Sequence, residues 1–310
     1  MEDRNDIEKL SEIHRDSNKN NKLFYFFMTL AFLFYSRQTI NWKLTSIFFA
    51  AMFLFDLTTT AINNYIDSKD YPEMLPLKRN MALAILLIMF FTSTALGLYL
   101  AYCTDVVVLL LGILCFLCGV CYTYGPIPIS RQPLGELASG IFQGVFVPFL
   151  LLYINMPKGT FLRLSLSFQE ISLNLQVLPL LTLLLLCVVP TCVTANIMLA
   201  NNTCDVEKDI KVKRFTLPYY LGTKNSLTLF ATLYLLCYIA PCVMVLFGML
   251  HPICLLMLLT FPVVWKNVRI FCKEQKKSTT FIVAIQNYKI LMGSYTLVIF
   301  FGGLMERFFI

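Results

Sequence analysis

Long apolar runs separated by short polar interruptions dominate the chain from about residue 23 onward. A membrane-spanning helix needs roughly 20 mostly apolar residues, and nine segments approach that measure, the first being short and the eighth marginal. They lie near residues 23–36, 43–64, 80–101, 104–124, 134–154, 177–200, 225–246, 249–265 and 281–304. The pattern predicts an all-α, polytopic membrane helix bundle at residues 23–310, preceded by a polar tail at residues 1–22.

The composition supports a membrane protein rather than a soluble domain. Hydrophobic residues make up 58% of the chain and charged residues 14%, and the mean hydropathy of +0.71 lies far above that of soluble domains. Most of the eleven cysteines fall within apolar runs, which favours small packing residues over a disulfide framework. The polar tail has no apolar core of the kind that a signal peptide carries.

The distribution of basic residues predicts the orientation. Of the 25 Lys and Arg residues, 19 fall in the tail and in the loops on its side of the membrane, against five on the opposite side. Cytoplasmic loops are enriched in these residues, so the tail and the ends of the second and sixth spans are predicted to be cytoplasmic. The net charge of +7 is explained by this topology and by anionic lipids; no motif indicates nucleic acid.

The second predicted span ends in a cluster of amides and acids, INNYIDSKDYPE at residues 62–73. If the helix continues, one face carries the oxygen-bearing side chains of Asp56, Thr60, Asn63, Asp67 and Asp70. An acid inside a span is costly and is expected to face the bundle interior or a watery cavity. Taken alone, the cluster is equally well explained as a helix end in water.

The sixth span repeats this pattern in ANIMLANNTCDVEKD at residues 195–209. Asn201, Asp205 and Asp209 are spaced at i, i+4 and i+8, and both clusters are predicted on the same side of the membrane. We therefore predict one shared site. Carboxylate and amide oxygens suit Mg²⁺, which commonly binds one or two carboxylates together with phosphate oxygens of a substrate. The candidate metal ligands are Asn63, Asp67, Asp70, Glu73, Asp205 and Asp209.

Basic residues follow each cluster: Lys78 and Arg79 after the first, Lys213 and Arg214 after the second. They are candidates to contact a diphosphate, although the topology bias alone would also place basic residues there. A diphosphate at the membrane surface beside apolar walls implies a lipid tail in the bilayer. The predicted substrate is therefore a polyprenyl diphosphate.

At these residues the sequence resembles the UbiA superfamily of intramembrane prenyltransferases, which carry NDxxDxxxD-like and DxxxD-like motifs on helices 2 and 6. Within it, NNTCDVEKD followed by KRFTLPYYLG, and YTYGPIPISRQPLGEL at residues 122–137, resemble the MenA branch, the 1,4-dihydroxy-2-naphthoate polyprenyltransferases. Three positions depart from the pattern: Asn64 replaces an Asp, Arg214 replaces a Lys, and the third acid of the first motif is either Asp70 or Glu73.

The resemblance implies Mg²⁺-dependent transfer of a polyprenyl group to 1,4-dihydroxy-2-naphthoate, with loss of the acceptor's carboxylate and a demethylmenaquinone product. The implied catalytic residues are Asp67, Asp205, Asp209, Arg214 and Tyr122. The implied substrate-binding residues are Asn63, Lys78, Arg79, Tyr124, Arg131, Asn201, Asn202 and Lys213. The two tyrosines are candidates to shield an allylic cation or, alternatively, belong to the interfacial aromatic belt.

Two alternatives to this function remain from the sequence. One is another acceptor within the superfamily, such as 4-hydroxybenzoate, homogentisate or haem. The other is a transporter, because polar helix faces also mark ion paths; the concentration of acids at one membrane face disfavours it. Four further polar residues, Glu136, Gln143, Asn287 and Lys289, are either acceptor contacts or interhelical hydrogen-bonding residues.

Overall fold

The computed structural model describes residues 23–67, 78–123, 128–167 and 169–308. The chain divides into two compact units, one formed by Ile40–Ser130 and the other by Met1–Thr39 together with Arg131–Ile310. Each unit has its own helix packing.

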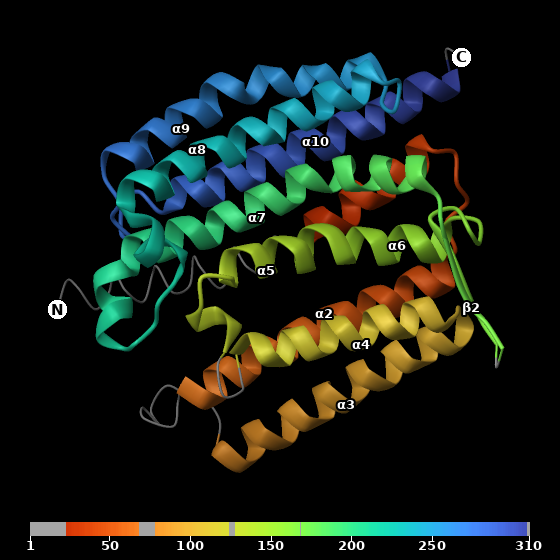
Figure 1. The fold of residues 1–310 in the computed structure, drawn as a ribbon, viewed down its shortest axis with the longest axis horizontal. Helices are drawn as coiled ribbons and strands as arrows, with labels where there is room; N and C mark the ends of the chain where they lie inside the picture. Colours follow the sequence, from red (N-terminus) through yellow and green to blue (C-terminus); the bar gives the residue numbers. More distant parts are fainter. Residues whose placement is uncertain (1–22, 68–77, 124–127, 168, 309–310) are drawn as a thin grey trace. The chain divides into compact units, whose positions relative to one another are not determined.

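The unit Ile40–Ser130 contains α2 (Trp42–Asp67), α3 (Arg79–Cys103) and α4 (Val106–Thr123), which run side by side in Figure 1. Aromatic rings join the three helices: Phe116 of α4 stacks on Phe55 of α2 with centroids 4.8 Å apart and lies 4.9 Å from Phe90 of α3. The sharp turn between α3 and α4 is closed by Asp105, whose Oδ1 accepts the backbone N–H of Val107 at 3.0 Å.

The larger unit holds the remaining elements. It begins with the helix Leu23–Tyr35. One span is built from α5 (Gly135–Ile141), the π-helix η3 (Phe142–Phe146) and α6 (Val147–Asn155). The strands β1 (Leu162–Leu166) and β2 (Ile171–Leu175) follow as an antiparallel hairpin. The other helices are α7 (Val177–Lys211), α8 (Leu217–Leu246), the 3₁₀ helix η4 (Pro252–Thr260), α9 (Phe261–Lys273) and α10 (Ile282–Phe308).

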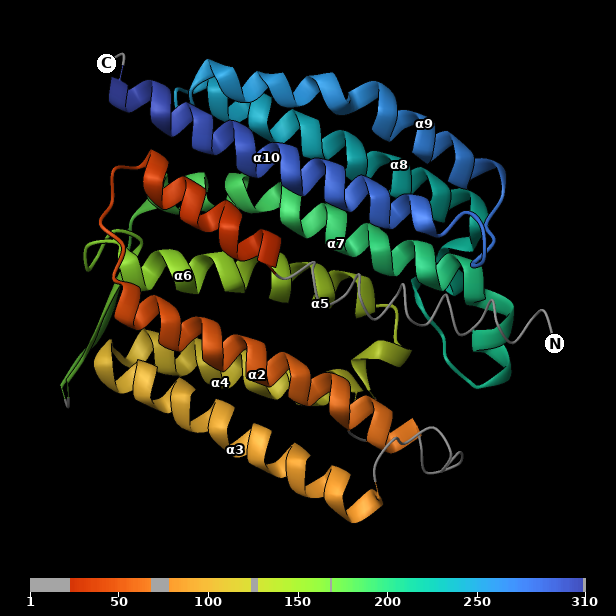
Figure 2. The same cartoon turned by 180° about the vertical axis from the view of Figure 1, so that it is seen from behind.

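Helices α7 to α10 form the packed centre of this unit and run side by side in Figure 1. Figure 2 shows the helix Leu23–Tyr35 beside α10, where Phe34 stacks on Phe300 with ring centroids 5.1 Å apart. The π-helix approaches α7 so closely that a Cβ at Gly144 would lie 2.5 Å from the backbone N of Thr191. A side chain at this position would force the two spans apart.

The predicted spans agree with the structure in number and position. Seven helices are long and apolar enough to cross a membrane, and the two shorter apolar helices Leu23–Tyr35 and Val106–Tyr122 complete the nine expected segments. All eleven cysteines are free, as expected for packing residues.

Three features differ from the sequence prediction. The hairpin between α6 and α7 was not predicted, because its strands, LRLSL and ISLNL, are only five residues long each. The sixth span continues past residue 200 to Lys211 as one helix. The seventh begins early, at Leu217, and is interrupted at Gly222, whose φ of 72° is accessible to glycine at little cost.

Candidate functional site

The second acidic motif forms the last turns of α7, and the way this helix ends positions its basic neighbour. The N–H of Arg214 donates to the carbonyl of Asp209 at 2.9 Å, and the N–H of Lys213 donates to that of Ile210 at 3.1 Å. These two bonds define a Schellman motif, in which the residue at the reversal takes a left-handed conformation. Here that residue is Lys213, with φ of 56°. The reversal returns Arg214 to the face of α7 that carries Asp209.

Arg214 joins two residues of the motif through its guanidinium. One nitrogen lies 3.7 Å from Asp209 Oδ1, and another donates to Asn202 Oδ1 at 3.3 Å. The amide nitrogen of Asn202 in turn donates to Glu136 Oε1, in the first turn of α5, at 2.7 Å. The neighbouring Asn201 donates to Asn202 Oδ1 at 3.3 Å. The cluster therefore links α5, α7 and the turn after α7 within one unit.

Two carboxylate oxygens in this cluster lack hydrogen-bond partners. Asp209 Oδ2 and Glu136 Oε2 are buried, and neither accepts a hydrogen bond from any residue that the structure describes. An unsatisfied buried polar group costs about 1–3 kcal/mol, and more when it is charged. The unpartnered oxygen of Asp209, on a carboxylate that Arg214 already contacts, indicates a site that is completed by a ligand.

Asp205, one turn before Asp209, forms an ion pair with Lys277. Lys277 lies in the segment between α9 and α10, 72 residues further along the chain. In the sequence, Lys277 is one of the basic residues whose distribution predicts the topology. No local pattern links it to Asp205, because the contact arises from the packing of the larger unit.

The other candidate residues of the larger unit lie close to this cluster in the chain. Arg131 ends η2 (Ile129–Arg131), and its carbonyl accepts the N–H of Phe215 at 3.1 Å, which ties the segment before α5 to the turn that carries Arg214. The side chains of Arg131 and Lys213 are exposed. They are available to a ligand at the surface.

In the unit Ile40–Ser130, Arg79 opens α3 and its guanidinium lies 4.6 Å from the ring centroid of Tyr65 on α2. Lys78, just before α3, is exposed, and Tyr122 is half-buried on α4. Asn63 and Asp67 belong to the last turns of α2, although their side chains lie outside the described part of the structure. Asp70, Glu73 and Tyr124 also fall outside the described residues.

Two of the remaining polar residues have neutral partners in the helix packing. Asn287 on α10 accepts a hydrogen bond from Asn267 on α9 at 2.8 Å and donates to the Val264 carbonyl at 3.3 Å. Gln143 accepts a hydrogen bond from Tyr25 at 3.3 Å. Their hydrogen bonds favour the interhelical alternative for both. Lys289 is exposed on α10.

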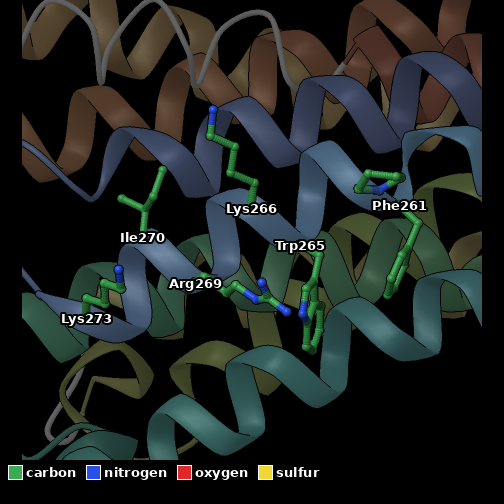
Figure 3. A pocket seen from close by; sticks show the side chains of 7 residues that line it. Phe261, Trp265, Lys266, Arg269, Ile270 and Lys273 are labelled. Carbon is green, nitrogen blue, oxygen red and sulfur yellow. The ribbon is translucent and has the colours of Figure 1, made fainter.

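A groove of about 560 Å³ lies elsewhere, along α9, and Figure 3 shows its lining from Phe261 to Lys273. Three of the lining residues, Lys266, Arg269 and Lys273, are basic, and the described lining contains no acid. The groove therefore lacks the carboxylates that a hard metal ion requires. The candidate site is the cluster at the end of α7.

The donor set at the end of α7 suits a divalent cation that is shared with a ligand. Asp205 and Asp209 supply carboxylates one helical turn apart, and Asp209 Oδ2 is unpartnered among the described residues. The described part of the chain contains no group of three or more His, Cys, Asp and Glu residues positioned to hold a metal alone. Mg²⁺ fits this arrangement, because it often binds one or two carboxylates and completes its shell with water and phosphate oxygens.

A bundle of apolar helices defines a polytopic membrane protein, and the paired acids and half-buried Arg214 at the end of α7 form its candidate site for an anionic ligand. The sequence model of the UbiA prenyltransferase family matches residues 24–289. The chain belongs to the UbiA prenyltransferase family and is an integral, multi-pass membrane protein.

Comparisons with individual proteins agree with this family. The 1,4-dihydroxy-2-naphthoate octaprenyltransferase of Bacillus subtilis (strain 168) is 28% identical over 180 residues, which cover 58% of this chain and 51% of that protein. The match thus spans about half of that relative.

Solved structures share the fold. A UbiA homologue from Aeropyrum pernix K1 has a TM-score of 0.59 at 15% identity, covering 93% of this chain and 98% of that one. A homologue from Archaeoglobus fulgidus bound to DMAPP and Mg²⁺ has a TM-score of 0.56 at 13% identity, covering 92% of this chain and 96% of that one. A digeranylgeranylglyceryl phosphate synthase structure has a TM-score of 0.64 at 18% identity, covering 92% and 95%. At these identities the likeness concerns the fold alone.

Proposed function

We propose that this protein transfers a polyprenyl group from its diphosphate to 1,4-dihydroxy-2-naphthoate, as a step of menaquinone biosynthesis. The observation that carries the proposal is the cluster at the end of α7, where unpartnered carboxylate oxygens lie beside Arg214. The resemblance of NNTCDVEKD and YTYGPIPISRQPLGEL to the MenA branch supports the choice of acceptor. The Bacillus subtilis relative supports the same acceptor.

In this proposal, Mg²⁺ is held by Asp205 and Asp209 of the second motif and by Asn63, Asp67 and either Asp70 or Glu73 of the first. The assignment of the first motif rests on its sequence pattern. The Mg²⁺ and DMAPP in the Archaeoglobus fulgidus homologue support the pairing of metal and substrate. When bound, the metal neutralises charge on the diphosphate and polarises the bond to its leaving oxygen.

Residues of the chain itself stabilise the departing diphosphate. As the bond between C1 and oxygen breaks, negative charge grows on the diphosphate and allylic cation character grows on C1. Arg214 presents a fork of N–H donors that matches phosphate oxygens, and its position is preset by Asp209 and Asn202. A preset donor costs little reorganisation as the charge develops.

The remaining proposed contacts divide by chemistry. The basic side chains of Lys78, Arg79, Arg131 and Lys213 bind the outer phosphate oxygens, and the amides of Asn201 and Asn202 complete the substrate contacts. Tyr122 and Tyr124 place aromatic faces beside the developing cation, which the ring quadrupole attracts. By the charge distribution, this site and the N-terminus face the cytoplasm.

The acceptor step needs no protein base, because the ring carbon loses CO₂ and not a proton. The ring carbon that carries the carboxylate attacks C1 of the prenyl group and forms the new C–C bond. The diphosphate has by then left with the electrons of the C1–O bond, and loss of CO₂ returns the electron pair of the broken C–C bond to the ring. The prenylated 1,4-dihydroxynaphthalene is the product.

The test is turnover by the purified protein in detergent with labelled geranylgeranyl diphosphate, offering 1,4-dihydroxy-2-naphthoate or 4-hydroxybenzoate, with Mg²⁺ or with EDTA. We expect a prenylated naphthalenediol, or the quinone formed from it in air, only with Mg²⁺. Asp67→Asn and Asp205→Asn should each abolish it. Glu207→Gln is the matched control, because Glu207 lies on α7 between the two acids and is exposed.

Each alternative outcome has a distinct meaning. Prenylation of the benzoate alone would retain the mechanism and refute the naphthoate acceptor. Equal loss in Glu207→Gln and Asp205→Asn would show that any change of charge on this helix end is harmful, and would remove the support for a specific acidic site.

A further inference from the structure

Lys277 is the one cation in contact with Asp205 among the described residues, and it comes from outside both acidic motifs. It lies in the polar segment that joins α9 to α10. A tight turn holds the backbone there: the N–H groups of Thr280 and Phe281 donate to the Lys276 carbonyl at 2.9 and 3.1 Å. The Lys276 N–H donates to Thr280 Oγ1 at 2.8 Å. The backbone of the turn is therefore fixed close to the end of α7.

The two acids of the second motif are paired in different ways. Arg214 follows Asp209 by five residues, is held by the Schellman turn and also donates to Asn202. Lys277 reaches Asp205 through a flexible four-carbon stem, and its side chain is 42% exposed against 27% for Arg214. An ammonium on such a stem can change partners without any movement of the backbone.

The oxygen that Lys277 contacts is Asp205 Oδ2, a proposed metal ligand. An ammonium and a divalent cation compete for the same carboxylate, because each binds it through the negative charge on the oxygen. When a metal takes Asp205, the displaced ammonium remains tethered within a side chain's length of the site. The diphosphate that arrives with the metal then offers the ammonium a new anionic partner.

We infer that Lys277 exchanges partners, from the Asp205 carboxylate in the free protein to a phosphate oxygen of the bound prenyl diphosphate. This role rests on the proposed function and adds a substrate-binding residue outside both acidic motifs. In this role, Lys277 weakens metal binding and strengthens diphosphate binding. In the free protein, Lys277 opposes the metal; in the complex, it stabilises the substrate.

The test uses Lys277→Met in the full-length protein, with Lys276→Met as the matched control. Lys276 is the adjacent residue, and its ion pair with Glu274, at 2.6 Å, is exposed. Mn²⁺ binding without substrate is followed by electron paramagnetic resonance. Binding of geranylgeranyl thiolodiphosphate, an unreactive analogue, is then measured by calorimetry in saturating Mg²⁺.

We expect Lys277→Met to tighten Mn²⁺ binding about threefold to tenfold, because the competing ammonium is gone. The same variant should weaken analogue binding about tenfold, because a charge-assisted contact is lost. Lys276→Met should change neither by more than about twofold. A purely structural ion pair would weaken both ligands in Lys277→Met or leave both unchanged, and either result would overturn the inference.

Mn²⁺ binding by Asp205→Asn distinguishes a failure of the proposed metal site from a failure of the Lys277 exchange. If this variant binds Mn²⁺ as tightly as the unmodified protein, Asp205 is not a metal ligand, and the exchange falls together with the proposed metal site. If Asp205→Asn loses Mn²⁺ while Lys277→Met shows no opposite effects, only the exchange is refuted.

Discussion

Two buried polar clusters in the larger unit have opposite characters. At the end of α7, Asp209 and Glu136 each leave one carboxylate oxygen without a partner among the described residues. Between α9 and α10, Asn267 and Asn287 are neutral amides joined by a 2.8 Å hydrogen bond, and Asn287 also donates to a backbone carbonyl. Both clusters consist of polar groups within spans, yet only the first contains acids with unpartnered oxygens.

This difference indicates that the α7 cluster serves ligand binding and that the α9–α10 pair serves helix packing. A neutral amide pair exchanges hydrogen bonds across two helices and can hold them together, typically by about 0.6–2 kcal/mol in a membrane protein. A charged oxygen without a partner lowers stability and persists where a ligand needs it. The α7 cluster should therefore affect activity more than stability, and the α9–α10 pair should do the reverse.

The sharpest test is Asp209→Asn. The variant keeps an acceptor oxygen for Arg214 and replaces the unpartnered charged oxygen with a neutral NH₂. We expect turnover to fall at least about 100-fold, as when a preset electrostatic group is removed, while the melting temperature stays the same or rises. Thermal unfolding and turnover are measured on the same preparation. A large fall in melting temperature would mean that Asp209 is a structural residue like Asn287.

Arg214→Gln is expected to have the next largest effect. It removes the guanidinium that contacts both Asp209 and Asn202, and we expect about a 100-fold loss in kcat. Arg214→Lys keeps the charge and loses the fork geometry, so its loss should be about tenfold. Equal losses in the two variants would indicate that the shape of the guanidinium, and not its charge, is what the reaction requires.

For the Asn267–Asn287 pair we expect the reverse, a loss of stability without a loss of substrate binding. Asn287→Leu leaves Asn267 without its partner and should lower the free energy of unfolding by about 1–2 kcal/mol, with KM for the diphosphate unchanged. Adding Asn267→Leu removes the orphaned amide and should return most of that loss. A double-mutant cycle in thermal unfolding measures both steps. If turnover falls in either variant by more than the folded fraction does, the pair contacts a substrate.

The bundle could be predicted from the sequence, because a run of roughly 20 apolar residues indicates a membrane-spanning helix. The sequence also predicted the acids of α7 because the same arrangement of Asn-Asn and carboxylates occurs twice, at residues 63–67 and 201–205. The helix end at Lys213 was not predictable by its usual signal, because a lysine occupies the left-handed position where glycine is common.

The partners of these acids were harder to predict, because they come from distant segments. Lys277 meets Asp205 across 72 residues, and the charge pattern alone explained it as a topology signal. Glu136 is one of four polar candidates from the sequence, and its hydrogen bond to Asn202 and its unpartnered Oε2 distinguish it from Asn287. Local patterns identify which residues are polar in a span; three-dimensional packing decides which of them remain unsatisfied.

Glu136→Gln should have the smallest effect and would define the boundary of the site. Gln retains an oxygen to accept the 2.7 Å hydrogen bond from Asn202, so the position of Asn202 and its contact with Arg214 should persist. A carboxylate beside a diphosphate repels it, so loss of this charge should leave KM for the diphosphate unchanged or lower, and kcat within about threefold. Glu136→Leu, which breaks the hydrogen bond, should cost about tenfold in kcat/KM. If Glu136→Gln is instead as harmful as Asp209→Asn, then both unpartnered oxygens meet a ligand, and the candidate site extends from α7 onto α5.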